Sequence, residues 1–235
     1  MRAISLLFIL ALACPAQELK RPKITGVAHI AIFSADIEAS RKFYTGLLGY
    51  EEAYKLTEPD GKLRLTFIKI NDRQFIEMFP EREAKSDRLN HIALEVEDIE
   101  AMRAYLAAKG IAVPAKVPKG RTGNLNFTIK DPDGHGVEFV EYLPDSDSGK
   151  TAGKSMGAGL SNRLAHIGIL VGSLEKANAF YRDLLGFQET WRGSRDGKVL
   201  SWVNMKAPDS EDYLEFMLYD RLPEPTKRGT AHHLC

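Results

Sequence analysis

FYTGLLGY at residues 43–50 reappears as FYRDLLGF at residues 180–187. The two copies end longer stretches that also match, VAHIAIFSADIEASRKFYTGLLGY and LAHIGILVGSLEKANAFYRDLLGF. A weaker copy, LNHIALEVEDIEAMRAYLAAKGI, occupies residues 89–111, and the C-terminal AHHLC matches the beginning of a fourth. Repetition of this kind indicates that one supersecondary unit recurs along the chain.

Each copy predicts a strand that begins with His, then a helix, then three more strands. An Asp or a Ser precedes each expected helix, where its side-chain oxygen can accept the free N–H groups of the first turn. In the first copy the later strands are expected at about 50–57, 63–70 and 73–79, where LRLTFIKI alternates as a half-buried strand does. In the second copy, DPDG marks a turn before GVEFVEY. The unit is therefore βαβββ.

The composition is that of ordinary folded domains. The chain has 235 residues, of which 44% are apolar and 27% charged, and this excludes a collagen or a disordered acidic segment. Lys plus Arg equals Asp plus Glu, at 32 each, so no global positive charge attracts nucleic acid. With only Cys14 and Cys235, the chain can hold neither a disulfide scaffold nor a zinc site built on cysteine pairs.

The N-terminus has the order of a secretory signal peptide. Arg2 precedes an apolar run at residues 4–13, and small residues follow around Cys14. The run has the usual length of a signal-peptide core and is too short to span a membrane, and no later apolar run is long enough either. We expect residues 1–16 to be a signal peptide and the mature chain to be periplasmic or extracellular. A lipid anchor at Cys14 and a buried N-terminal element are the alternatives.

Residues 144–161, PDSDSGKTAGKSMGAGLS, divide the repeats into two pairs. They have no apolar periodicity and are rich in Gly and Ser, which predicts a flexible linker. The expected domains are residues 23–143, with two units, and residues 162–235, with a third unit and the beginning of a truncated fourth. Without a complete partner, the third unit is expected to expose an apolar sheet face that favours association, for instance as a homodimer.

The first His of each unit and a Glu in its last strand recur at almost constant spacing. The pairs are His29 and Glu77 (48 residues apart), His91 and Glu138 (47), and His166 and Glu215 (49). A single His at a strand end, or a single Glu facing solvent, would be ordinary. Here each Glu has apolar neighbours in a strand expected to be partly buried, where an unpaired carboxylate is costly.

A divalent cation held by two imidazoles and two carboxylates would compensate these carboxylates. The spacing therefore predicts a metal site in the first domain and a second, incomplete one after it. The expected ligands are His29, Glu77, His91 and Glu138 for the first site, and His166, Glu215 and His233 for the second.

The sequence resembles the vicinal oxygen chelate superfamily, which includes glyoxalase I, extradiol dioxygenases, methylmalonyl-CoA epimerase and the bleomycin-resistance proteins. The resembling stretches are HIAIFSADIEASRKFYTGLLGY, NHIALEVEDIEAM, DPDGHGVEF, HIGILVGSLEKANAFYRDLLGF and YLEFML. The resemblance implies an α+β fold in which paired βαβββ modules form a half-open barrel, with one complete domain and a truncated second one.

The resemblance also implies a metal-dependent lyase or isomerase of the glyoxalase kind. By position, His29, Glu77, His91 and Glu138 are similar to the His-Glu-His-Glu set of glyoxalase I and the epimerase. Such a set suits Zn²⁺, Ni²⁺, Co²⁺ or Mn²⁺. The implied substrate is a small molecule whose two vicinal oxygens bind the ion, and Glu138 or Glu77 would move the proton as general base.

Two other activities within the superfamily stay open. An extradiol ring-cleaving dioxygenase would use Fe(II), but Thr128 stands where those enzymes tend to carry a Tyr, which counts against this chemistry in the first domain. A bleomycin-resistance-like protein would bind a small molecule without turnover, and such proteins usually lack the ligand set. Export would separate the protein from cytosolic thiol adducts, which counts against methylglyoxal detoxification.

Overall fold

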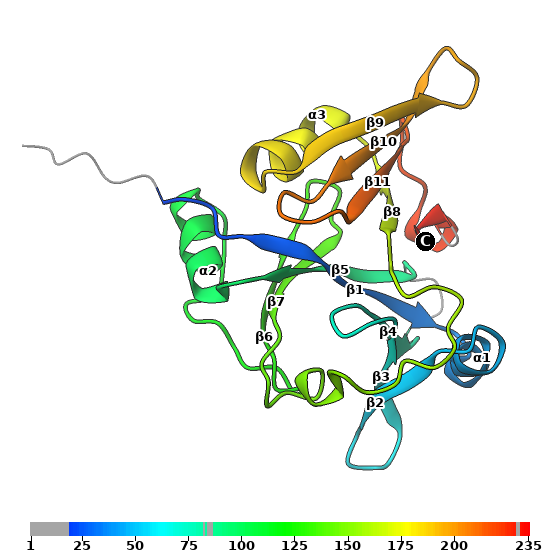
Figure 1. Ribbon diagram of the computed structural model, residues 1–235. Helices are drawn as coiled ribbons and strands as arrows, with labels where there is room; N and C mark the ends of the chain where they lie inside the picture. The colour runs from blue at the N-terminus through cyan, green and yellow to red at the C-terminus, as the bar shows by residue number, and fades with distance from the viewer. Residues whose placement is uncertain (1–18, 82, 84–86, 229–230) are drawn as a thin grey trace, which may run out of the picture.

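The computed structural model describes residues 19–81, 83, 87–228 and 231–235. They form two β-sheets with a few short helices (Figure 1). The expected signal peptide, residues 1–16, and Cys14 lie outside the described residues. Within the described part of the chain, every helix is too short or too polar to cross a membrane.

The first sheet has seven strands in the order β2-β3-β4-β1-β5-β7-β6. They are β1 (Ile24–Ser34), β2 (Glu51–Thr57), β3 (Leu63–Lys69), β4 (Phe75–Pro80), β5 (Leu89–Val96), β6 (Leu125–Lys130) and β7 (Gly136–Glu141). The central strands β1 and β5 run antiparallel, and each has the last strand of its own module as a parallel neighbour, β4 and β7 respectively. Two modules therefore meet at β1 and β5, and the sheet stays open between its edge strands β2 and β6.

The second sheet has the order β12-β8-β11-β10-β9. Its strands are β8 (His166–Val171), β9 (Gln188–Ser194), β10 (Leu200–Lys206), β11 (Tyr213–Leu218) and β12 (His233–Leu234). The short β12 pairs antiparallel with β8, as β5 does with β1. The third module therefore repeats the arrangement of the first, with a short antiparallel strand where the first module meets the second.

The helices begin where the sequence predicts. They are α1 (Ile37–Lys42), continued by the π-helical η1 (Phe43–Leu47), then α2 (Ile99–Ala108), the 3₁₀ turn η2 (Gly149–Thr151), α3 (Leu174–Ala177), continued by the π-helical η3 (Asn178–Leu184), and α4 (Pro225–Arg228). The side chains of Asp36, Asp98 and Ser173 accept hydrogen bonds from first-turn N–H groups at 2.9, 2.9 and 3.4 Å. These caps satisfy N–H groups that have no partner inside the helix.

The second module departs from the expected three strands after its helix. Only β6 and β7 follow α2 as regular strands, and residues 109–124 add a single bridge between Lys119 and Leu125. Pro114 and Pro118 stand in this stretch. Because proline has no N–H group to donate to a neighbouring strand, it disfavours regular pairing there.

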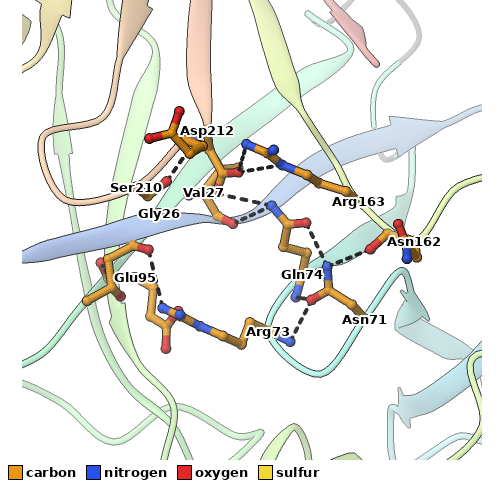
Figure 2. Close-up of a pocket in the computed structure, with 12 residues that line it drawn as sticks. Gly26, Val27, Asn71, Arg73, Gln74, Glu95, Asn162, Arg163, Ser210 and Asp212 are labelled. Atoms are coloured by element: carbon orange, nitrogen blue, oxygen red, sulfur yellow. Dashed lines mark hydrogen bonds and ion pairs between the residues drawn. The ribbon is translucent and has the colours of Figure 1, made fainter.

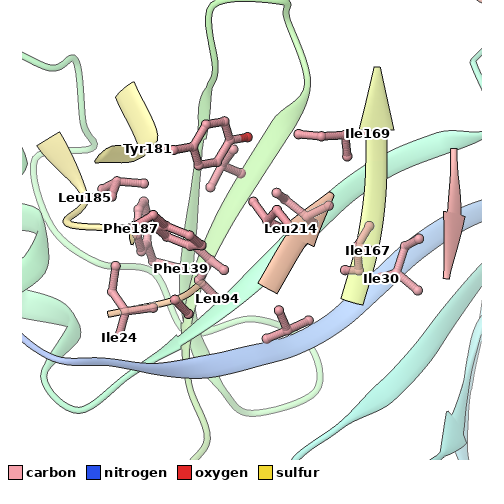
Figure 3. Packing of buried hydrophobic residues seen from close by; sticks show 14 of the residues in the cluster. Ile24, Ile30, Leu94, Phe139, Ile167, Ile169, Tyr181, Leu185, Phe187 and Leu214 are labelled. Atoms are coloured by element: carbon pink, nitrogen blue, oxygen red, sulfur yellow. The ribbon is translucent and has the colours of Figure 1, made fainter. Parts of the chain in front are cut away.

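The two sheets pack back to back through one apolar core (Figure 3). Side chains of both sheets meet there at 0–1% exposure: Ile30, Leu94 and Phe139 from the first, and Ile167, Ile169 and Leu214 from the second. Residues next to each other in a strand point to opposite faces. Because these apolar residues neighbour His29, Glu138, His166 and Glu215 in the chain, the candidate ligands of both sheets face away from the shared core.

The segment 144–161 connects the two sheets and lies along the first. The ammonium group of Lys69, which is 1% exposed, donates to the carbonyl oxygens of Thr151 and Lys154 at 2.6 and 2.8 Å. The hydroxyl groups of Tyr54 and Ser148 are 2.6 Å apart. These contacts hold the connection next to β2 and β3, close to the open face of the first sheet.

Candidate metal centre

Strand register places the four ligands predicted for the first domain on one face of the sheet. Two rows of neighbours cross the central strands: Glu77–Ala31–His91 and His29–Ala93–Glu138. The methyl side chains of Ala31 and Ala93 leave room between the longer chains. Beside His91 stands Gly136, where a Cβ would lie only 2.9 Å from the Cβ of His91. Small residues on this face therefore let the two imidazoles and two carboxylates meet.

The donor atoms of the two imidazoles lie close to each other and to both carboxylates. The Nε2 atoms of His29 and His91 are 3.0 Å apart. The Nε2 atom of His91 lies 3.3 Å from an oxygen of both Glu77 and Glu138, and that of His29 lies 3.5 and 3.9 Å from them. Donors that share one ion at about 2.1 Å lie roughly 3.0–3.4 Å from each other. The distances from His91 fall in this range, whereas Nε2 of His29 lies farther from both carboxylates. His29, Glu77 and His91 form one group whose donor atoms all lie within 4.8 Å of one another, and Glu138 lies at the edge of this group, next to His91.

Burial shifts the pKa values of this cluster. The pKa of His29 lies well below its ordinary value, because burial and then the neighbouring His91 disfavour the imidazolium. Burial would also lower the pKa of His91, but the hydrogen bond with Glu77 and the charges of Glu138 and Glu77 outweigh it and raise that pKa. Burial raises the pKa of Glu138 to about 7. The face therefore offers a neutral imidazole and carboxylates poorly solvated by water.

Tyr142 belongs to the site although the sequence analysis did not select it. Its hydroxyl group lies 3.1 Å from Nδ1 of His29. This contact leaves Nε2 of His29 turned towards His91 and the carboxylates. The alternation of side chains along a strand could have identified it, because Tyr142 stands four residues after Glu138 and therefore on the same side. Glu141, by contrast, faces away and accepts a hydrogen bond from the N–H of Ile99.

A pocket of about 260 Å³ opens over the cluster. Its apolar walls are Leu56, Leu65, Phe67, Phe79 and Val140. Arg64 and Arg121 also line it, and both pair with Glu58, at 2.6 and 3.4 Å. Two guanidinium groups against one carboxylate give this part of the pocket an excess of positive charge.

The second sheet repeats three of the four positions. Glu215 and His233 flank Gly168 in register, as Glu77 and His91 flank Ala31. The Nε2 atoms of His166 and His233 are 3.2 Å apart, and that of His233 lies 3.3 Å from Glu215. The side chains of His233 and Glu215 are 36% and 20% exposed, so this cluster is more open than the first.

The pattern of strands and ligands is matched by a family of known proteins. A model of the Glyoxalase/Bleomycin resistance protein/Dioxygenase superfamily covers residues 26–139 and 163–235. The chain belongs to this superfamily. The resemblance drawn from the repeated motifs is therefore confirmed, as is the α+β fold of paired modules with open sheets.

Characterised members of the superfamily align with parts of the chain. Lactoylglutathione lyase of Neisseria meningitidis is 26% identical over 128 residues, which are 51% of this chain and 93% of the lyase. A Mn(II)-bound glyoxalase from Novosphingobium aromaticivorans has a TM-score of 0.64 at 19% identity, covering 84% of this chain and 63% of its own. A variant of homoprotocatechuate 2,3-dioxygenase from Brevibacterium fuscum has a TM-score of 0.63 at 17% identity, covering 86% and 56%. The chain spans less than two thirds of either solved structure, and these two comparisons establish the fold alone.

Thr128 stands at the position where the sequence analysis looked for the Tyr typical of extradiol dioxygenases. It pairs with Glu138 in the register of β6 and β7, and its side chain is exposed. A threonine hydroxyl is a far weaker acid than a phenol. This position of the first sheet therefore lacks the acidic hydroxyl group that a Tyr would supply.

Proposed function

We propose that the first domain is a divalent-metal-dependent lyase or isomerase that transfers a proton on a small substrate with two vicinal oxygens. One observation carries this proposal: two imidazoles and two carboxylates converge on one buried face, with the Nε2 atoms of the two His 3.0 Å apart and 3.3–3.9 Å from the carboxylate oxygens. The match to the lactoylglutathione lyase over about half of the chain supports it.

The donor set fits a divalent cation. Among the described residues, the carboxylates of Glu77 and Glu138 form ion pairs only with His29 and His91. Buried carboxylates without a full positive partner are costly, so an ion of charge two would balance them. Nitrogen and oxygen donors in equal number suit Zn²⁺, Ni²⁺, Co²⁺ or Mn²⁺.

A cation bound there would polarise the two substrate oxygens. Residues of the chain are proposed to move the proton and to keep water away. Glu138 is the proposed proton acceptor, because its carboxylate lies at the edge of the cluster and lines the pocket. Glu77 lines the same pocket and is the second candidate. Phe67 and Phe79 exclude water from the face on which the proton moves.

The lining of the pocket favours a small anionic substrate. About 260 Å³ accommodates a compact molecule, with its vicinal oxygens at the ligand cluster. The two positive charges of Arg64 and Arg121 are only partly balanced by the one negative charge of Glu58. A carboxylate or phosphate group at the other end of the substrate would therefore be attracted. Export, as the N-terminal sequence predicts, would separate the protein from cytosolic thiols, and we propose a substrate other than a thiol adduct.

The test is metal loading followed by substrate screening with and without oxygen. The metal-free chain is loaded with Zn²⁺, Ni²⁺, Co²⁺, Mn²⁺ or Fe²⁺, and then offered α-keto aldehydes, acyl thioesters and catechols. We expect about one ion per first domain and turnover that consumes no oxygen. Stoichiometric oxygen uptake with a catechol would replace the proposal by a ring-cleaving dioxygenase. Ligand binding without any retained metal or turnover would replace it by a binding protein.

A further inference from the structure

A polar pocket of about 370 Å³ lies between the two sheets, just before the strands that carry both ligand clusters (Figure 2). Four residues that line this pocket or adjoin it, which we call the crossover, stand two positions before a candidate His or three before a candidate Glu. They are Val27 (before His29), Leu164 (before His166), Gln74 (before Glu77) and Asp212 (before Glu215). The crossover thus adjoins the start of every ligand strand of the first and third modules.

Asp212 of the second sheet binds the backbone of the first. Its Oδ2 atom accepts hydrogen bonds from the N–H of Val27 at 3.0 Å and from the side-chain amide of Gln74 at 3.3 Å. Its Oδ1 atom accepts from Arg163 at 2.9 and 3.1 Å. Figure 2 shows the carboxylate of Asp212 between these three partners.

Gln74 of the first sheet binds the second in return. Its Oε1 atom accepts from the N–H of Leu164 at 2.9 Å, and its Nε2 atom donates to the carbonyl of Leu164 at 2.9 Å. The same Nε2 atom donates to the carbonyl of Val27 at 3.2 Å. Gln74 is 5% exposed, so these bonds lie away from solvent. Each sheet therefore holds the backbone that leads into the other sheet's first candidate His.

The backbone at Val27 depends on this contact, because no neighbouring strand pairs with it on that side. Pairing of β1 with β4 begins only at His29, and pairing with β5 shifts register between Ile24 and Gly26 and again between Val27 and His29. Gly26 has a φ of +147°, and a Cβ there would lie 2.5 Å from Oδ2 of Asp212. Irregular backbone of this kind re-aims the side chains that follow it. Asp212 and Gln74 take the place of the missing strand partner two residues before His29.

We infer that Asp212 is a positioning residue for the first metal centre: it fixes the irregular start of β1 and thereby the direction of the His29 imidazole. Gln74 does the same for β8 and His166. The inference rests on the metal assignment proposed above. It means that the second sheet, which contributes no ligand to the first centre, sets how well that centre is preorganised.

The rival explanation is that Asp212 merely fastens the two sheets together. Tyr105 offers a matched control, because its hydroxyl group donates to the carbonyl of Leu184 at 2.8 Å across the same packed sheets. Tyr105→Phe removes one hydrogen bond between the sheets, whereas Asp212→Ala removes two, to Val27 and Gln74, and Tyr105 lies in α2. A fastening role alone predicts that both variants weaken the metal centre, in proportion to the hydrogen bonds lost.

The experiment uses the full chain with His166→Ala and His233→Ala, so that only the first centre titrates. Asp212→Ala and Tyr105→Phe are added to this background singly, and Co²⁺ affinity and the Co²⁺ absorption spectrum are measured. In the metal-free proteins, hydrogen exchange of the Ala31 amide reports the order of β1 without any ion. Asp212→Asn, which keeps the shape of the side chain, serves if the alanine variant does not fold.

We expect Asp212→Ala to lower Co²⁺ affinity about tenfold or more, as outer contacts of metal ligands do, to alter the spectrum and to speed exchange at Ala31. Tyr105→Phe should leave all three unchanged. Unchanged affinity and exchange in both Asp212 variants, or a loss in Tyr105→Phe of half that in Asp212→Ala or more, would overturn the inference alone. A chain that retains no metal even with Asp212 intact would overturn the proposed function as well.

Discussion

The two ligand clusters are built by the same strand register and yet differ in completeness. In both, a Glu and a His flank a small residue, Ala31 in the first sheet and Gly168 in the second. The first cluster adds Glu138 from β7 of the second module. In the second sheet, β12 is the strand equivalent to β5, and the described residues include no strand beyond it. The comparison shows that one module and the first strand of the next assemble three donors, whereas the fourth, Glu138, needs the last strand of the second module.

The clusters also differ in how their first His is held. Nδ1 of His29 contacts the hydroxyl group of Tyr142, whereas Nδ1 of His166 is buried without a hydrogen-bond partner among the described residues. The ring of His166 instead stacks on Tyr213, with centroids 4.7 Å apart. Since the contact of one ring nitrogen fixes which nitrogen is free to bind a metal, the first cluster is the better prepared of the two.

Removing the imidazoles of each cluster should give the largest contrast. The double variant of His29 and His91 to Ala should retain no stoichiometric metal after gel filtration at neutral pH, because only two carboxylates remain. The matching change of His166 and His233 should leave one ion per chain. Metal content by mass spectrometry measures both. Full metal content in the first variant would show that the buried cluster is not the principal site.

The recurrence of His and Glu allowed a complete and an incomplete ligand cluster to be predicted from the sequence. A spacing of 48 and 47 residues in two successive modules is enough to place His29, Glu77, His91 and Glu138 together once the modules pair. The period of the last strand also separates Glu138, which faces the cluster, from Glu141, which caps α2. Local pattern suffices here because all four residues stand on regular strands.

Contacts between distant segments were not predictable in the same way. Lys69 alternates correctly within its strand, but nothing local indicates that its ammonium group binds carbonyl groups of the connecting segment. The same holds for Asp212, whose partners Val27 and Gln74 lie far from it in the chain. Such bonds depend on how the two sheets pack. The hydrophobic effect that drives this packing is non-directional, so the apolar pattern does not specify which polar groups will meet.

Glu138→Gln should make the first cluster resemble the second by removing the charge of its fourth donor. We expect weaker metal binding and a loss of turnover of about 10²- to 10⁴-fold, because an amide cannot accept the proton. Isothermal titration with Zn²⁺ and the rate on the substrate found by screening measure the two effects. The control is Glu141→Gln on the same strand, which keeps an oxygen for the N–H of Ile99. Full turnover in Glu138→Gln would transfer the proton-acceptor role to another group.

Tyr142→Phe should make His29 resemble His166. The phenyl ring fills the same space but leaves Nδ1 of His29 without its partner. We expect metal affinity to fall about tenfold with the fold unchanged, since outer partners of ligand imidazoles have effects of that size. Affinity by competition with a chromophoric chelator checks this, and near-UV circular dichroism checks the fold. Unchanged affinity would mean that the hydroxyl group does not orient the ring.

The smallest expected effect concerns Asp131, which joins the turn between β6 and β7 to the third module. Its carboxylate contacts Nδ1 of His135 at 2.8 Å and accepts a hydrogen bond from the hydroxyl group of Tyr181 in the third module at 3.0 Å. Burial would raise the pKa of Asp131, but the hydrogen bond and charge of His135 outweigh it and lower the pKa. A carboxyl group whose pKa is lowered on folding stabilises the fold above its unfolded pKa of about 3.9, and loses this effect as the pH falls through the folded value.

Asp131→Asn should therefore lower the free energy of unfolding by about 1 kcal/mol at pH 7, and the difference from the unmodified chain should shrink below about pH 4. Urea unfolding followed by far-UV circular dichroism and by the fluorescence of Trp191 and Trp202, both in the second sheet, measures it. Asp133→Asn in the same turn is the control, because burial raises the pKa of Asp133 and reverses the sign of the pH dependence.

Since the sheets share one core, both probes should report a single transition in every variant. Separate transitions would show that the two sheets unfold independently, and would confine the role of Asp131 to docking.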